Sequence, residues 1–182
     1  MKNHLVIFVL ALLISSCIPV KIAPDIENYK IVVAKKFKRK LPKTTSFVFN
    51  DPKDDGAFYD YLNAKFDLKH IDVGANIPFK LHNKTYYLSY SETERETKTV
   101  NLPFVIIDAK RESSGNSKLF EDNYTARKGK WYILLTVYDD NLKNCLKPEY
   151  SNSNKVITHL EALRKEYLRT QNYLELQFKK KS

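Results

Sequence analysis

A run of ten unbroken apolar residues near the start of the sequence limits what the chain can fold into more than any other feature. Residues 5–14 read LVIFVLALLI, and they lie between Lys2 and the small residues Ser15 and Ser16. A helix that crosses a bilayer needs about 20 apolar residues, so this run is too short to span one. A basic start, a short apolar core and small residues are typical of an export signal that is removed. We therefore expect residues 1–16 to be a signal peptide and the remaining chain to fold without it.

The end of this run resembles the lipobox of bacterial lipoproteins. Its residues are Ile14, Ser15, Ser16 and Cys17: an aliphatic residue, two small residues and a cysteine. The resemblance implies that a peptidase cuts between Ser16 and Cys17, and that Cys17 carries a diacylglyceryl group on its thiol and an acyl group on its amino terminus. An ordinary secretory signal or an uncleaved anchor is the alternative. The resemblance covers the export segment alone, and we recognise no family for the rest of the chain.

A lipidated Cys17 would anchor the protein to a membrane, because two acyl chains are enough for stable attachment. Ile18, not Asp, follows the cysteine, so the inner-membrane retention signal of enteric lipoproteins is absent. The resemblance thus implies the outer membrane, facing the periplasm. Residues 17–28 contain Pro19 and Pro24 and no apolar periodicity, which predicts an extended tether. Export argues against a nucleic-acid partner, despite a net charge of +10.

Composition bounds the remainder, residues 29–182, which by length we expect to form a single domain. The sequence is 43% hydrophobic and 13% aromatic, enough to build a core and to exclude a disordered tail. Its 4 glycines are not clustered, which excludes the glycine-rich loops that bind nucleotide phosphates. Since Cys17 would be modified, Cys145 has no disulfide partner.

Short apolar or alternating segments predict a sheet. The predicted strands are residues 29–34, 45–49, 77–81, 85–90, 99–108, 118–126 and 130–138. Turn residues at 82–84 and 127–129 predict two hairpins. Segment 99–108 is apolar enough to be central, although Pro103 indicates a bulge or an edge there.

Two segments have the periodicity of helices. Residues 51–68 begin with Asp51 as N-cap and Pro52 at the first helical position. Residues 155–179 carry a longer apolar stripe, made of Val156, Leu160, Leu163, Tyr167, Leu174 and Phe178. Together these patterns predict an α+β fold, an antiparallel sheet of about five to seven strands with both helices on one face. A coiled-coil partner for the long helix is the alternative.

The densest group of charges lies shortly after the tether. It consists of Lys35, Lys36, Lys38, Arg39, Lys40 and Lys43. One interpretation is a solvated loop or an edge strand whose lysines prevent edge pairing. The other is a contact with an anionic partner, either lipid headgroups or an envelope polymer, since the group lies near the predicted anchor.

Residues capable of catalysis or metal binding are scattered along the chain. They are His70, His82, His159, Cys145 and the adjacent pairs Asp54–Asp55 and Asp139–Asp140. Adjacent side chains diverge on a helix or a strand, so neither acidic pair makes a two-carboxylate site by itself. No metal-ligand spacing or nucleophile motif is present, and we expect no cofactor and no enzymatic activity.

The sequence therefore predicts a membrane-anchored lipoprotein of the cell envelope that binds or scaffolds a partner, including an unidentified protein. Two alternatives stay open. One is a small envelope hydrolase whose acid and base meet only in the fold. The other is a carrier whose aromatic strands enclose an apolar ligand.

Overall fold

The structure, a computed structural model, describes residues 17–54 and 56–173. The predicted signal peptide with Ile14, Ser15 and Ser16 therefore lies outside the described residues. So does the end of the predicted C-terminal helix, with Leu174 and Phe178.

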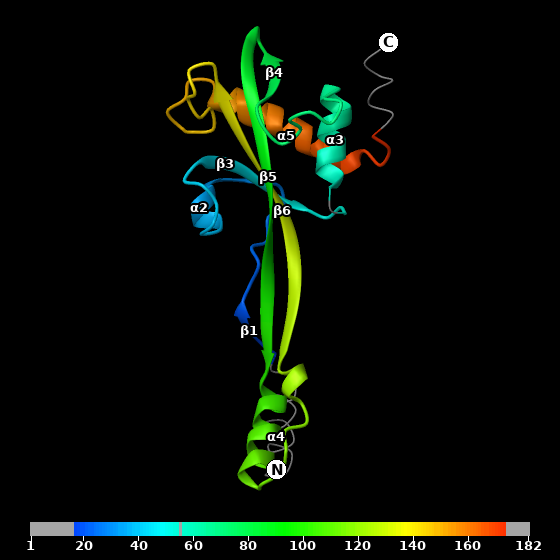
Figure 1. The fold of residues 1–182 in the computed structure, drawn as a ribbon. Helices are drawn as coiled ribbons and strands as arrows, with labels where there is room; N and C mark the ends of the chain where they lie inside the picture. Colours follow the sequence, from blue (N-terminus) through cyan, green and yellow to red (C-terminus); the bar gives the residue numbers. More distant parts are fainter. Residues whose placement is uncertain (1–16, 55, 174–182) are drawn as a thin grey trace, which may run out of the picture. The chain divides into compact units, whose positions relative to one another are not determined.

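The described elements are strands and helices, and the predicted α+β class is confirmed (Figure 1). In chain order they are β1 Cys17–Lys21, β2 Lys30–Val33, α2 Ala34–Phe37, β3 Thr45–Asp51, α3 Ala57–Phe66, β4 Ile77–Leu81, β5 Lys84–Asn101, α4 Leu102–Ser113, the 3-10 turn η1 Glu121–Asn123, β6 Thr125–Asp139 and α5 Ser153–Arg169. The strands form a six-stranded sheet in the order β1-β5-β6-β3-β2, with β4 paired to β5. This count lies within the predicted range.

The described chain divides into two compact units. The small unit contains residues 17–24 and 94–130, and the large unit contains residues 25–93 and 131–173. The sequence predicts one domain over residues 29–182. Because β5 and β6 run without a break through the borders at residues 93–94 and 130–131, no turn or linker signal marks these two borders.

In the large unit, one sheet face packs against α3 and α5, as predicted. Odd-numbered residues of β3 and β6 point to this face, and the helices contribute their apolar stripes. The fully buried members include Phe47, Phe49, Phe58, Leu62, Ile133, Leu135, Val137, Val156, Leu160 and Tyr167. Figure 1 shows α3 and α5 beside one another above β3.

Even-numbered residues of the same strands form a second core on the opposite face. Val48, Tyr132 and Leu134 pack there with Ile26 and with Phe37 of α2. Phe37 and Tyr132 meet edge to face, with ring centroids 5.0 Å apart. Both faces of β3 and β6 are thus covered.

The helix predicted from Asp51 starts later. Asp51 still belongs to β3 and pairs with Trp131 of β6. Its carboxylate accepts the Tyr167 hydroxyl at 2.9 Å instead of capping a helix. α3 begins at Ala57, after Gly56, whose φ of 77° is a left-handed conformation that glycine adopts without strain.

The strand predicted over residues 99–108 is wrong beyond Asn101. β5 ends there and α4 begins at Leu102, with Pro103 in its first turn. A proline in that position costs the helix no hydrogen bond, because the first helical N–H groups have no acceptor within the helix. Pro103 therefore starts a helix instead of interrupting a strand.

The hairpin predicted at residues 127–129 is also wrong. β6 is one strand through these residues, and residues 118–124 form a loop with η1. Gly129 lies within this strand rather than in a turn, and a Cβ at this position would overlap the carboxylate of Glu94 unless that side chain moved. Such close approach is a recognised reason for a glycine within a strand.

The hairpin predicted between residues 77–81 and 85–90 is confirmed. β4 and β5 pair from Ile77↔Leu88 to Leu81↔Lys84. The two turn residues, His82 and Asn83, both have positive φ, as a tight two-residue hairpin turn requires.

The C-terminal helix is confirmed in type but is shorter than predicted. α5 ends at Arg169, and its stripe is buried from Val156 to Tyr167. The side chain of Lys53 binds its last carbonyl groups, and an i, i+4 ion pair joins Glu161 and Lys165 at 2.8 Å.

Part of the predicted tether is paired. Residues 17–21 form β1, an extended segment as expected, but its backbone is hydrogen-bonded to β5. Farther along, Ala23 is buried and its N–H donates to the Thr97 hydroxyl at 3.0 Å. The extended conformation follows from the prolines, but the pairing could not be read from them.

Candidate functional site

An open pocket of about 770 Å³ lies in the large unit, at the end of β6 and the loop after it. Its lining is polar and rich in lysine. The residues are Lys43, Thr44, Lys84, Tyr138, Asp139, Asn141, Leu142, Lys143, Asn144, Lys147, Glu149, Tyr150 and Ser151. We call it the lysine pocket.

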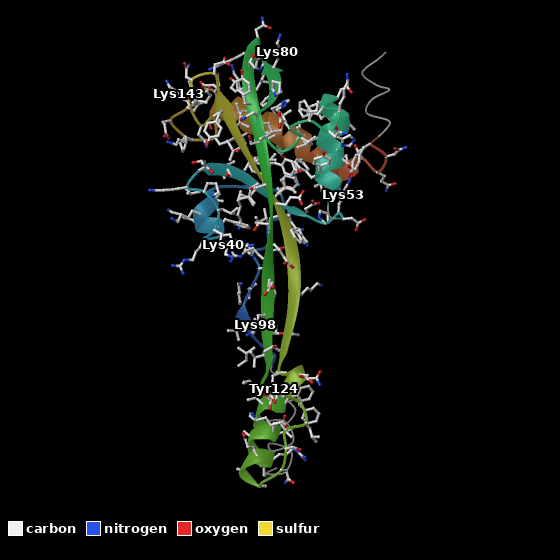
Figure 2. The ribbon with its side chains drawn as sticks, in the orientation of Figure 1. Lys40, Lys53, Lys80, Lys98, Tyr124 and Lys143 are labelled. Atoms are coloured by element: carbon white, nitrogen blue, oxygen red, sulfur yellow. The ribbon has the colours of Figure 1, made fainter. Side chains whose placement is uncertain are left out.

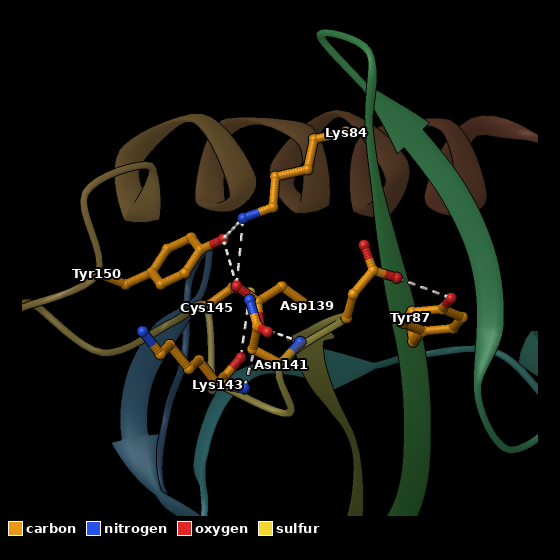
Figure 3. A network of polar contacts seen from close by, with 8 residues as sticks. Lys84, Tyr87, Asp139, Asn141, Lys143, Cys145 and Tyr150 are labelled. Carbon is orange, nitrogen blue, oxygen red and sulfur yellow. Dashed lines mark hydrogen bonds and ion pairs between the residues drawn. The ribbon is translucent and has the colours of Figure 1, made fainter.

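Asp139 organises one wall of the lysine pocket (Figure 3). One carboxylate oxygen accepts the backbone N–H groups of Asn141 at 3.1 Å and Lys143 at 3.0 Å. The other accepts the Lys84 ammonium and the Tyr150 hydroxyl, each at 3.2 Å. Aspartate commonly closes turns through such bonds to following N–H groups, so the end of β6 is held in a fixed loop.

The contacts determine the charge states at this wall. Burial would raise the pKa of Asp139, but the hydrogen bonds from Lys143, Lys84, Tyr150 and Asn141 lower it overall. The hydrogen bond to Asp139 raises the pKa of Lys84. Burial raises the pKa of Tyr150 above the usual range, so its hydroxyl stays protonated. Asp139 and Lys84 are therefore a charged, mutually compensated pair at neutral pH.

Further lysines leave the pocket with a surplus of positive charge. Besides Asp139, the lining contains the acidic residue Glu149, whose carboxylate lies 3.5 Å from the ammonium group of Lys147. Lys43 and Lys143 add two exposed ammonium groups. The opening thus presents cations, while both of these carboxylates have a lysine beside them.

The structure brings only one member of the predicted basic group into this pocket. Lys35 and Lys36 are exposed on α2, a short helix rather than the expected loop or edge strand. Lys38, Arg39 and Lys40 follow it, and Lys43 alone reaches the pocket lining. Figure 2 shows Lys40 beside α2 and Lys143 in the loop after β6.

The predicted lipidation residue is the first residue described. Cys17 opens β1, and its backbone pairs with Asn101 at the end of β5. Ser16, on the other side of the predicted cleavage point, lies outside the described residues.

Cys145 is a core residue. Its side chain is fully buried, and its thiol donates to the Lys143 carbonyl at 3.3 Å. Burial raises the pKa of the thiol, which disfavours the nucleophilic thiolate. This arrangement suits a structural role for Cys145.

The histidines lie in different environments. His159 stacks on Phe79 with ring centroids 4.8 Å apart. His70 contacts Tyr59 and Asn63 through its two ring nitrogens, at 3.3 Å each. His82 lies in the turn between β4 and β5. Among residues 17–54 and 56–173, no three His, Cys, Asp or Glu side chains lie close enough to hold a metal ion.

The adjacent acids diverge as predicted where they can be followed. Asp139 faces Lys84 and Tyr150, whereas Asp140 accepts the Tyr87 hydroxyl at 3.0 Å. Asp54 is exposed, and Asp55 lies outside the described residues. In the part of the chain that is described, no helix combines the length and apolar character needed to cross a membrane.

Sequence reasoning missed the lysine pocket because its parts are far apart in the chain. Lys84 and Asp139 are 55 positions apart and meet through the pairing of β5 with β6. One local signal existed: two aspartates and an asparagine at the end of a strong strand are typical of a turn closed by aspartate. The lysines around it gave no periodic signal.

Neither protein-family models, nor curated proteins, nor solved structures gave a match to this chain. Its function therefore has to be inferred from its own residues.

Proposed function

We propose that this protein is a lipid-anchored, non-enzymatic binding protein of the bacterial cell envelope, and that its lysine pocket binds an anionic group of an envelope polymer. The observation that carries the binding role is the surplus of lysines around an open pocket whose acids are already paired. Lys43, Lys84, Lys143 and Lys147 surround it. Phosphate and carboxylate groups are the ligands that such a cluster favours, through point charges and hydrogen bonds.

The arrangement of Asp139 favours binding over hydrolysis. A general base needs a free lone pair directed at the substrate and a pKa near the working pH. Asp139 is nearly buried, accepts hydrogen bonds from four groups and has a lowered pKa. It holds the loop and Lys84 in place, which is a positioning role.

The apolar-carrier alternative receives less support. The two core clusters fill both faces of β3 and β6 with side chains. The lysine pocket is lined by charged and amide groups rather than by phenylalanine. An apolar ligand would leave those polar groups without solvent and without partners.

Anchoring rests on the lipobox resemblance of residues 14–17. A lipid on Cys17 would attach directly to the first residue of β1, and the outer membrane facing the periplasm is the proposed location. Treatment with an inhibitor of the lipoprotein peptidase should leave residues 1–16 attached. Cys17→Ser should move the protein out of the lipid-anchored fraction. Unchanged processing and fractionation in both tests would contradict the anchor.

Binding is tested by titrating the purified protein with short polyphosphate and with polygalacturonate, a phosphate and a carboxylate polymer. The double variant Lys43→Gln/Lys143→Gln should weaken binding roughly tenfold or more, because each lost charge–charge contact contributes about 1 kcal/mol. Its matched control is Lys35→Gln/Lys36→Gln, which removes the same charge from α2. Equal losses in both variants would show nonspecific attraction and contradict the pocket.

A further inference from the structure

Two isoleucines in the apolar half of α4 are exposed in the small unit. α4 begins with the sequence LPFVII, yet Asp108 is its one buried residue among those described. The side chains of Ile106 and Ile107 are 61% and 45% exposed, and that of nearby Leu119 is 61% exposed. A helix whose apolar residues face outward needs another surface to cover them.

This exposed segment is held in a defined structure. The buried carboxylate of Asp108 accepts the backbone N–H groups of Leu119 at 3.0 Å and Phe120 at 2.7 Å, and the Tyr124 hydroxyl at 2.8 Å. The Phe120 ring stacks on Phe104 at 4.7 Å. Figure 2 labels Tyr124, which follows η1.

The orientation of Ile106 follows from these contacts. Phe104 and Asp108 are one helical turn apart, so they lie on the same side of α4, the side that faces residues 119–124. Ile106 is two residues from each of them, about 200° around the helix. It therefore points away from the loop that α4 packs against.

The register of β1 places the predicted lipid beside this helix. Cys17 pairs with Asn101, the residue immediately before α4, and Ile18 pairs with Val100. Acyl chains on Cys17 would therefore enter a bilayer next to the first turn of α4. This step rests on the lipid anchor of the proposed function.

Charges on the other side of Cys17 suit an anionic lipid surface. Lys21 pairs directly with Lys98 across β1 and β5. Like charges in opposite positions destabilise a sheet in water. These lysines lie about 13 Å along the strand from Cys17, within reach of the headgroup region, where anionic lipids attract them.

From the register, the exposed isoleucines and the paired lysines, we propose that α4 is a membrane-docking element: its Ile106 and Ile107 insert into the interface of the bilayer that holds the Cys17 lipid. The lipid supplies attachment. α4 and the Lys21–Lys98 pair fix the orientation of the small unit on the surface, as interfacial amphipathic helices do at the headgroup boundary.

The test uses the full chain, produced in a bacterium that processes lipoproteins and reconstituted in phosphatidylethanolamine–phosphatidylglycerol vesicles containing brominated phosphatidylcholine. Trp131 is the single tryptophan of the sequence, so the Trp131→Phe variant has no tryptophan fluorescence. Into it we place Ile106→Trp, or the control Ile22→Trp, a 65% exposed isoleucine of the same unit beyond Lys21. Bromine should quench Trp at position 106 by roughly half, because interfacial helices lie 5–10 Å deep, and should quench position 22 far less.

A second measurement uses the unsubstituted protein. Amide hydrogen exchange of residues 102–113 should slow on vesicles relative to detergent-free solution. Unquenched Trp at position 106 together with unchanged exchange would overturn the docking element. In solution without vesicles, iodide quenching of Trp at position 106 could fall as the protein concentration rises. That result would also overturn the docking element, and would assign the face to a second copy of the chain.

The anchor and the docking element can fail separately. Mass spectrometry of the N-terminal peptide reports the lipid on Cys17, whereas quenching at position 106 reports α4. A lipidated protein with an unquenched position 106 would keep the proposed anchor and remove the docking element. An unlipidated protein whose position 106 is quenched on vesicles would remove the proposed anchor and keep the docking element.

Discussion

The ammonium group of Lys53 lies 2.6 Å from the carbonyl oxygen of Tyr167, in the last turn of α5. It also donates to the Thr170 carbonyl at 2.5 Å and the Tyr173 hydroxyl at 3.2 Å. The last carbonyl groups of a helix accept no hydrogen bond from within the helix. The negative end of the helix dipole also favours a cation there. Lys53 thus connects the segment after β3 to the end of α5.

Replacing Lys53 by methionine should therefore destabilise the large unit. Lys53→Met keeps most of the apolar stem but leaves the carbonyls without their donor. We expect the free energy of unfolding to fall by about 2 kcal/mol. Urea unfolding measures this, with Lys155→Met, an exposed lysine in the first turn of α5, as control. Equal stability of the two variants would contradict the capping role.

Asp108 should control the order of the loop in the small unit. Asp108→Asn removes the charge that Leu119, Phe120 and Tyr124 contact. Amide exchange at positions 119 and 120 should then accelerate, because a charge-assisted hydrogen bond becomes a weaker neutral one. The exposed acid of the same unit, Asp122, provides the control as Asp122→Asn. Unchanged protection in Asp108→Asn would show that the Phe104–Phe120 stacking alone holds the loop.

The same carboxylate predicts a pH dependence. Burial would raise the pKa of Asp108, but the N–H groups of Leu119 and Phe120 and the Tyr124 hydroxyl lower it overall from about 3.8. When the pKa of a group is lower in the folded than in the unfolded state, its ionisation stabilises the fold. This contribution is fully present above the pKa of the unfolded chain. Protection of the loop amides should thus be constant above about pH 4 and be lost as the pH falls through the lowered pKa. Constant protection down to pH 2 would contradict a role for the ionised Asp108 carboxylate in ordering the loop.

His159 predicts a second dependence at higher pH. Burial beside Phe79 lowers its pKa from 6.5, Lys65 lowers it further and Glu166 opposes this. The folded state therefore disfavours the protonated ring, and stability is lost as the pH falls below about 6.5, where the unfolded chain binds the proton. Urea unfolding at pH 7.5 and 5.5 should show this loss, and His159→Gln should remove most of it. An equal loss in the variant would assign the effect to other groups.

The sequence predicted elements whose own periodicity decides their structure. The stripe from Val156 to Tyr167 repeats at helical spacing, and burial follows that spacing. The turn His82–Asn83 has the residues of a tight turn between two alternating segments. In both places the local pattern and the tertiary packing favour the same structure.

Prediction from the sequence failed where the local pattern and the tertiary packing favour different structures. Val105, Ile106 and Ile107 favour strands by propensity, but Pro103 begins a helix at their start. Gly129 looked like a turn but provides space for Glu94 on a neighbouring strand. That pairing, like the meeting of Lys84 with Asp139, depends on strand neighbours that no local pattern specifies.

Cys145 should be unreactive in the native protein, which separates its structural role from the nucleophile required by a cysteine hydrolase. Cys17→Ser leaves Cys145 as the one cysteine in the chain. Because its thiol is buried and its pKa is raised, iodoacetamide at pH 8 should modify it roughly a thousandfold more slowly in buffer than in concentrated urea, since modification then requires unfolding. The modified fraction is followed by mass spectrometry. Native labelling as fast as in urea would show an accessible thiol and revive the hydrolase alternative.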